Sequence, residues 1–180
     1  YREVFPLIRD NMMWLGNGLH SGNSYFSSPL SKDYAAGVFD EATGLLKFRN
    51  VIWMTNIEHG KRHQSLPLMT MEENIKFSKH KEIRGSEYQR YDNYDAIEVP
   101  FTDSIPSDYD GVMGVPISFL DKYNPKQFEI VGSFNNGEHG NDVGAKKLSV
   151  DYRGKKLSWN GPLVNSKPLY KRILIRQRRP

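Results

Sequence analysis

Residues 108–132 constrain the fold of this chain most strongly, because local signals for a turn, a helix and a strand follow one another within them. The segment Gly111-Val-Met-Gly114 is small and apolar, which suits a backbone that packs closely against a neighbour. Pro116 can begin a helix, and the apolar residues after it keep helical spacing until Asn124-Pro125 ends the pattern. Gln127–Val131 then alternates like a strand. The stretch therefore predicts an α/β unit that packs against a sheet.

Two apolar runs nearer the start of the chain predict further strands. Arg2–Asp10 has the apolar stripe of a short helix, and Met12–Leu15 after it is suited to a buried strand. Val51–Thr55 is apolar on both faces and rich in β-branched residues, so we expect a central strand there with Trp53 buried. This arrangement is typical of the second half of a nucleotide-binding α/β sheet, and we expect a more irregular lobe after about residue 60.

The net charge of +4 is modest, but it is unevenly distributed along the 180 residues. From residue 141 to the end, 11 Lys and Arg residues stand against two Asp residues, a net charge of +9. The first 140 residues hold the other 14 basic residues and 19 acidic ones, a net charge of −5. This asymmetry favours a polyanion-binding end. The alternative, that the basic residues only decorate solvated strand faces, stays open.

Composition restricts the class of protein. Hydrophobic residues make up 38% and charged residues 26% of the chain, which is typical of a globular domain. No run of about 18 apolar residues occurs, so we expect no membrane span. The absence of cysteine excludes disulfides, thiolate zinc sites and a cysteine nucleophile, and it is compatible with a cytoplasmic protein. Because the chain starts with Tyr1 inside helix-like sequence, we expect it to be a fragment of a longer protein.

Beyond these local patterns, Tyr109–Gly132 resembles the signature near the C-terminal end of the EcoRI-type adenine-specific DNA methyltransferases. This signature is long and far more specific than an isolated glycine pattern. The resemblance covers nearly the whole chain, because further segments resemble the same family in the same order: Tyr1–Ile8, Met13–Gly16, Val51–Asn56, Lys61–His63, Tyr91–Ile97 and Leu169–Ile175.

The resemblance implies a restriction-modification enzyme that transfers a methyl group from S-adenosylmethionine to the N6 amine of adenine in duplex DNA. Such chemistry requires the target base to leave the stack. The family's catalytic Asn-Pro-Pro-Phe motif and its glycine-containing cofactor loop are absent here, and we expect both upstream of Tyr1. We therefore expect no catalytic residue in this chain, which alone would be inactive, and S-adenosylmethionine bound mainly by a missing N-terminal part.

The resemblance also implies a fold class and a division of the chain. We expect an α/β fold, with the C-terminal part of a Rossmann-like S-adenosylmethionine-dependent methyltransferase sheet in residues 1–60. Residues 61–180 are expected to form an irregular, β-rich DNA-recognition lobe. Basic side chains would contact phosphates, and polar or aromatic side chains would select the sequence. The candidate DNA-binding residues are Lys61, Arg62, Asn93, Tyr94, Asn135, Asn136, Lys146, Lys147, Arg153, Lys155 and Lys156.

Two other classes of function stay open. A stand-alone DNA-binding module would bind DNA with steep salt dependence and no cofactor affinity. A metal-dependent nuclease would use clustered carboxylates such as Asp108 and Asp110, but these neighbour turn-forming residues and we favour turns. His59 and His63 mimic a metal pair, although Gly60 argues against the helix that such a pair requires. We therefore assign no metal ligand, and the recognised DNA sequence and the oligomeric state stay open.

Overall fold

A computed structural model of the chain describes residues 3–16, 24–27, 37–48, 52–134 and 143–179. The chain divides into two compact units, one made of Tyr1–Met12 with Gly60–Pro180 and the other of Met13–His59. The second boundary lies beside the predicted domain boundary, but the first helix belongs to the later unit. The functions predicted for the two domains stay predictions.

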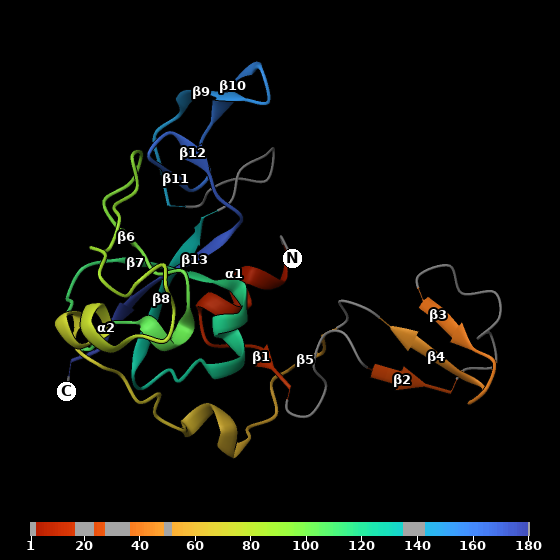
Figure 1. Cartoon of the computed structure of the whole chain (residues 1–180). Helices are drawn as coiled ribbons and strands as arrows, with labels where there is room; N and C mark the ends of the chain where they lie inside the picture. The colour runs from red at the N-terminus through yellow and green to blue at the C-terminus, as the bar shows by residue number, and fades with distance from the viewer. Residues whose placement is uncertain (1–2, 17–23, 28–36, 49–51, 135–142, 180) are drawn as a thin grey trace. The chain divides into compact units, whose positions relative to one another are not determined.

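The larger unit contains a four-stranded sheet in the order β6–β7–β13–β8 (Figure 1). β13 (Arg172–Gln177) runs antiparallel to both β7 (Met113–Pro116) and β8 (Phe128–Phe134), and β6 (Ile97–Glu98) runs parallel to β7. Three successive residues at the centre of β13 are buried, Ile173, Leu174 and Ile175. Because successive strand residues point to opposite faces, β13 is covered on both faces of a mixed sheet.

Residues 108–132 supply β7, the 3-10 helix η3 (Ile117–Lys122) and most of β8. The predicted order of extended segment, helix and strand is confirmed, with a 3-10 helix, a form that short connectors commonly adopt. Phe119 of η3 packs edge-on against Phe128 of β8, with 5.2 Å between the ring centroids. The main-chain oxygen of Asn124 accepts bonds from the amides of Gln127 and Phe128 at 3.1 and 2.9 Å, which turns the chain into β8.

Short helices complete this unit. Helix α1 (Val4–Arg9) buries Phe5 and Ile8 and contacts β8. Helix α2 (Met71–Phe77) begins at a capping box formed by Thr70 and Glu73. The 3-10 helices η1 (Gly60–His63) and η2 (Thr102–Ser104) lie in the connections. Within the described ranges, no helix has the length and apolarity needed to cross a membrane.

The smaller unit contains two antiparallel sheets. β2 (Ser24–Phe26), β4 (Leu45–Phe48) and β3 (Gly37–Asp40) form the first sheet in that order. The turn between β3 and β4 ends at Gly44, whose φ of 68° is the left-handed conformation that glycine permits. β1 (Trp14–Leu15) and β5 (Met54–Thr55) form the second sheet.

The prediction of a central strand over residues 51–55 is wrong. Residue 51 lies outside the described residues, β5 comprises only the last two residues of the run, and Trp53 is 41% exposed. The Trp53 ring lies against Gly16, where a Cβ atom would stand 1.9 Å from the ring, so this contact replaces burial inside a sheet. The largest sheet lies within residues 97–177, in the lobe that we expected to be β-rich but irregular, because distant strands pair there in a way that local patterns do not encode.

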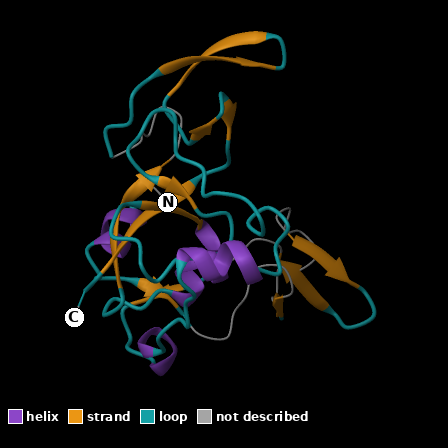
Figure 2. Ribbon diagram, turned by 60° about the vertical axis from the view of Figure 1, so that its left-hand side comes forward, coloured by secondary structure: helices purple, strands orange, loops and turns teal. Residues whose placement is uncertain are grey.

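Two hairpins complete the larger unit. β9 (Leu148–Tyr152) pairs with β10 (Lys155–Trp159), and β11 (Leu163–Val164) pairs with β12 (Lys167–Pro168). The sequence of residues 146–150 and of residues 155–159 predicts two short strands here. The second is confirmed as β10, and the first begins two residues later, at Leu148. Figures 1 and 2 show the β9–β10 hairpin as a ribbon that extends away from the four-stranded sheet.

Candidate nucleic-acid interface

The β9–β10 ribbon has one apolar face and one polar face, because its cross-strand pairs alternate between the two sides. The apolar face carries Leu148, Val150, Tyr152, Lys155, Leu157 and Trp159, and the polar face carries Ser149, Asp151, Lys156 and Ser158. Val150 is only 3% exposed, whereas all four residues of the polar face are exposed. On the apolar face, Leu148 and Trp159 are half-buried, but Tyr152 and Leu157 are 40% and 38% exposed. The ribbon is therefore anchored through the Val150 side, and its polar face is open to solvent.

A two-residue turn joins the two strands of the ribbon. Arg153 and Gly154 have φ angles of 53° and 74°, the left-handed pair that matches the twist of a tight hairpin. The amide of Gly154 donates a hydrogen bond to Oδ1 of Asp151 at 3.1 Å. The Arg153 guanidinium lies 5.3 Å from the centre of the Tyr152 ring. The turn thus sets the register of the ribbon and places a cation at its tip.

A hollow of about 240 Å³ lies beside the apolar face. Its walls come from the ribbon and from the segment that runs from β12 towards β13: Tyr152, Trp159, Pro168, Leu169, Tyr170 and Lys171. The Trp159 indole donates to the carbonyl oxygen of Pro162 at 3.2 Å, which holds the ring in place. The hollow therefore belongs to the supported side of the ribbon, opposite the polar face.

Asn93 holds both ends of the ribbon. Its side chain is 3% exposed, and its Nδ2 atom donates to the carbonyl oxygens of Lys146 at 3.1 Å and Gly161 at 2.9 Å. Lys146 also donates its amide to the carbonyl oxygen of Asn93 at 3.0 Å. Lys146 precedes β9 and Gly161 follows β10, so one buried amide ties the two ends together. This matters because a two-stranded hairpin alone is only marginally stable in water.

Asp92 supports the neighbouring β11–β12 hairpin in a similar way. Its carboxylate accepts hydrogen bonds from the amides of Asn165 at 3.1 Å and Ser166 at 2.7 Å. Both turn residues have positive φ angles, 49° and 61°. Residues 91–95 therefore form a platform that positions both hairpins, which agrees with the prediction that the aspartate here serves a turn.

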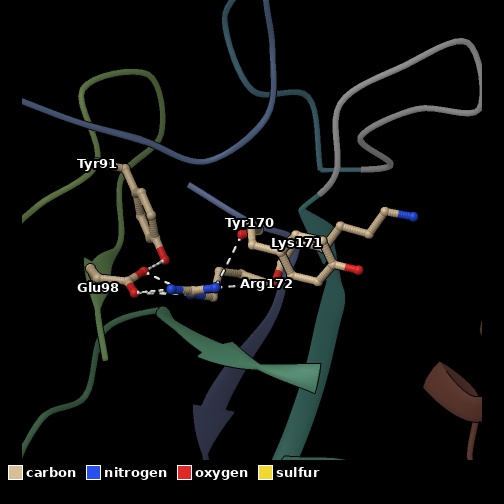
Figure 3. A network of polar contacts seen from close by, with 5 residues as sticks. All are labelled: Tyr91, Glu98, Tyr170, Lys171 and Arg172. Carbon is tan, nitrogen blue, oxygen red and sulfur yellow. Dashed lines mark hydrogen bonds and ion pairs between the residues drawn. The ribbon is translucent and has the colours of Figure 1, made fainter. Parts of the chain in front are cut away.

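A buried polar network connects this platform to the four-stranded sheet (Figure 3). Arg172 of β13 donates to the carboxylate of Glu98 on β6, with Nη2 and Oε1 2.6 Å apart, and the Tyr91 hydroxyl donates to the same carboxylate. Nη1 of Arg172 donates to the carbonyl oxygens of Tyr170 and Lys171 at 3.1 and 3.3 Å. The network thus joins the Tyr170–Lys171 side of the hollow to the core.

Burial shapes the chemistry of this network. Burial of the Tyr91 hydroxyl, and then the negative charge of Glu98, raise the pKa of Tyr91 well above its ordinary value. The hydroxyl therefore remains a hydrogen-bond donor at neutral pH. Tyr91 can reach Glu98 because Gly114 has no side chain: a Cβ atom there would stand 2.0 Å from the Tyr91 oxygen. Gly114, one of the glycines in the 108–132 stretch, is thus explained by a close approach.

Residues 1–178 match the model of a family described as adenine-specific methyltransferase EcoRI. The chain belongs to this family. The resemblance inferred from the Tyr109–Gly132 signature is thereby confirmed.

The relatives of this EcoRI-type methyltransferase chain are longer than the chain itself. It is 38% identical to the Type II methyltransferase M.EcoRI of Escherichia coli, over 99% of this chain and 47% of that protein. It is 32% identical to M.MgeORF184P of Mycoplasma genitalium and 30% identical to M.MpnI of Mycoplasma pneumoniae, in each case over 53% of the relative. The chain spans about half the length of these curated relatives. No solved structure matches it.

In this EcoRI-type methyltransferase chain, the structure brings one group of predicted DNA-binding residues together. Lys146 and Lys147 lead into the ribbon, Arg153 forms its tip, and Lys155 and Lys156 lie on β10; all five side chains are exposed. They stand on opposite faces, because Lys155 is on the apolar side and Lys156 on the polar side. The ribbon therefore carries basic side chains on both of its faces, at its base and at its tip.

Lys61 and Arg62 lie on η1 rather than on the ribbon. Nζ of Lys61 is 2.6 Å from Oδ1 of Asp121, and both side chains are only partly exposed. Arg62 is 5% exposed and donates to the side-chain oxygen of Asn11. Its burial leaves little surface for a phosphate group to contact.

Two candidate residues for sequence selection, Asn93 and Tyr94, have structural roles. Asn93 clamps the ribbon, and the half-buried Tyr94 lies against the core with its ring centroid 5.6 Å from that of Phe134. Asn135 and Asn136 fall outside the described residues. The exposed polar groups beside the basic residues are instead Ser149, Asp151 and Ser158, which the sequence reasoning did not single out. The period-two alternation of the two strands around the Arg153-Gly154 turn would have identified them.

The clustered aspartates do not form one site. Asp95 pairs with Arg90, Asp103 with Lys79 and His80, and Asp110 with Arg179, while Asp108 accepts from the amide of Met71. Nε2 of His59 lies 2.8 Å from the carbonyl oxygen of Leu15. Among the residues that the structure describes, no group of three or more His, Cys, Asp or Glu side chains could hold a metal ion.

Proposed function

We propose that this chain is the DNA-recognition part of a restriction-modification enzyme that transfers a methyl group from S-adenosylmethionine to the N6 amine of adenine in duplex DNA. Membership of the adenine-specific methyltransferase family supports the reaction, and the relatives are named Type II methyltransferases. The recognition role rests on one observation, the exposed ribbon. Residues 146–156 carry five basic side chains and only one acidic side chain, Asp151. Exposed cations of this kind bind phosphates.

The proposal assigns catalysis and cofactor binding to a region outside this chain. Cofactors of this size bind where a strand, a glycine-containing loop and a helix N-terminus meet. The one parallel strand pair in the described residues, β6 and β7, is connected through a segment whose only helix is the three-residue η2. In the part of the chain that the structure describes, the residues therefore do not fit S-adenosylmethionine, and we derive no step of methyl transfer from them.

The same division of roles can be proposed for the fold. We propose that the Rossmann-like sheet implied by the family lies mainly in an N-terminal part, and that residues 1–60 complete it. The two-stranded β1–β5 sheet has outer edges at which further strands can pair, which supports this role. A cytoplasmic location follows from the proposal, because cellular DNA is the substrate, and the absence of cysteine is compatible with it.

Salt-dependent DNA binding tests the recognition role. The double variant Lys155→Ala, Lys156→Ala should weaken binding of the chain to every duplex, measured by fluorescence anisotropy at several salt concentrations. The plot of log affinity against log salt concentration should become less steep, its negative slope losing about 0.9 in magnitude for each phosphate that the variant no longer neutralises. The matched control, Lys122→Ala with Lys126→Ala, removes two exposed lysines outside the ribbon and should leave the slope unchanged. Equal slopes for the wild type and both double variants would show that the ribbon lysines do not contact DNA.

Cofactor binding separates the enzyme from a stand-alone DNA-binding module. Calorimetry of the chain with S-adenosylmethionine should give no binding, and the chain alone should transfer no methyl group. Joining the chain to the N-terminal half of a relative such as M.EcoRI should restore methyl transfer. A stand-alone module would bind DNA with the same salt dependence and gain no activity in that fusion. Micromolar cofactor binding by the chain alone would place the cofactor site within it.

A further inference from the structure

The polar face of the ribbon carries more than positive charge. Ser149 lies directly across from Ser158, and Asp151 lies directly across from Lys156, so two adjacent cross-strand pairs present hydroxyl, carboxylate and ammonium groups to solvent. A surface that only attracted phosphates would gain nothing from the carboxylate, which repels them. The hydrogen bond to Gly154 does not require it either, since Asn or Ser accepts the same bond in a turn.

We propose that this polar face, formed by Ser149, Asp151, Lys156 and Ser158, enters the major groove of the duplex and selects the DNA sequence by hydrogen bonds to base edges. The inference rests on the proposed function and assigns the recognition role to particular atoms. Phosphate contacts orient a protein on DNA, whereas base-edge contacts carry the sequence information. In this arrangement, the flanking Lys146, Lys147 and Arg153 contact the backbone.

The dimensions of the ribbon fit a groove. The major groove of B-DNA, about 12 Å wide, admits a two-stranded β-ribbon. The five residue pairs of β9 and β10 give a length of roughly 14 Å at about 3.4 Å per residue, which corresponds to about four base pairs. The tight two-residue turn adds little bulk at the tip. The ribbon can therefore follow the groove over a short site.

The chemistry of the Asp151–Lys156 pair specifies which base pair it fits. In the major groove, guanine presents the acceptors O6 and N7, and cytosine presents the donor N4 amine. Lys156 can donate to guanine while Asp151 accepts from cytosine, so the cross-strand pair is complementary to one G·C pair. Serine hydroxyls both donate and accept, so Ser149 and Ser158 fit either an A·T or a G·C neighbour.

The polar face is exposed at all four of its positions, whereas the opposite face is partly covered. Val150 is buried on the opposite side, and Tyr152 and Trp159 line the hollow there. Asn93 fixes both ends of the hairpin. The side chains of the polar face therefore lie on a hairpin that is held at both ends rather than on a loose loop, and this keeps their geometry defined when DNA binds.

The test uses the intact methyltransferase and a pool of duplexes with a randomised centre of about eight base pairs. Bound duplexes are sequenced for the wild type, Asp151→Asn, Lys156→Met and the control Lys155→Ala. The wild type should enrich a G·C pair at one position. Asp151→Asn keeps the acceptor for Gly154, and it should lose that preference about tenfold while binding random duplexes more tightly. Lys156→Met does not touch the turn and should lose the same preference.

Each result supports or overturns the inference. Lys155→Ala, on the other face, should weaken all duplexes alike and leave the selected sequence unchanged. If Asp151→Asn tightens binding with the selected sequence intact, the carboxylate serves only the turn and the inference fails. A wild-type pool without sequence preference overturns it as well. Both of these outcomes leave the proposed function standing, whereas a protein that binds no duplex at all overturns the proposed function too. Equal denaturation midpoints for the variants show that altered folding does not cause the change.

Discussion

The four-stranded sheet and the β9–β10 ribbon use charged residues in opposite ways. In the sheet, Arg172 and Glu98 leave only 13% and 9% of their side chains exposed, and each group is held by several hydrogen bonds (Figure 3). On the ribbon, Lys155 and Lys156 are exposed. A buried charge pair fixes the geometry of a core, whereas an exposed one is available to a ligand.

This difference changes the meaning of the +9 charge of the C-terminal segment. Arg172 pairs with Glu98, Arg179 with Asp110, and Arg178 donates to the carbonyl oxygen of Phe128 at 3.3 Å. Arg172 therefore serves the fold, and the exposed Arg178 and Arg179 already have partners within the protein, although all three contribute to the same net charge as the ribbon lysines. A charge count identifies a basic region, but burial and partners decide which of its residues can meet a polyanion.

The largest expected effect comes from breaking the buried pair. Arg172→Met should lower the free energy of unfolding by about 3–5 kcal/mol, because it leaves the Glu98 carboxylate buried without its cation. Urea denaturation followed by tryptophan fluorescence measures the loss. The double variant with Glu98→Gln should recover part of it. A loss below about 1 kcal/mol, the value typical of surface pairs, would show that the Arg172–Glu98 pair contributes no more to stability than an exposed pair does.

A smaller effect is expected where the sheet region supports the ribbon. Asn93→Ala removes two hydrogen bonds to buried carbonyl oxygens and should destabilise the protein by about 1–3 kcal/mol. Its distinguishing result is local: amides of β9 and β10 should exchange with deuterium faster, while those of β13 should change less. Gln89→Ala, which removes the exposed bond that Asn165 donates to Gln89, is the control and should leave the ribbon amides unchanged. Uniformly faster exchange would show that ribbon and sheet open as one unit.

Asp103 is intermediate between the buried Arg172–Glu98 pair and the exposed lysines of the ribbon, with 39% of its side chain exposed. Burial acts to raise its pKa, but hydrogen bonds from Lys79 and His80 and their charges outweigh burial, so the pKa of Asp103 is lowered overall. A lowered folded-state pKa contributes stability above the unfolded value of 3.8, and that contribution is lost as the pH falls through the folded value. Asp103→Asn should therefore cost at most about 1 kcal/mol at about pH 6, and the cost should shrink progressively as the pH falls below 3.8. A cost that persists in acid would assign the effect to packing.

Local patterns predicted much of the fold but not its pairing. Residues 108–132 gave the correct order of elements, and the strand at 155–159 was predicted with its bounds, because apolar spacing and turn residues act over short distances. The run at 51–55 failed, since Trp53 packs against Gly16 outside any central sheet. Similarly, no local pattern shows that Asn93 reaches both ends of a hairpin more than 50 residues away. These long-range hydrogen bonds give Asn93, a candidate DNA-binding residue, a structural role that the sequence does not reveal.

The smallest expected effect on stability is also the most informative about the ribbon. Lys155→Ala with Lys156→Ala should change the free energy of unfolding by no more than about 0.5 kcal/mol, because both side chains are exposed and the anchoring interactions of Val150 and Asn93 remain. The same double variant is expected to weaken DNA binding, so stability and binding should separate. Urea denaturation of the variant beside the salt-dependent binding measurement checks this directly. If the variant unfolded as easily as Arg172→Met, the ribbon lysines would belong to the folded core, and weaker DNA binding by the variant would no longer indicate that these lysines touch DNA.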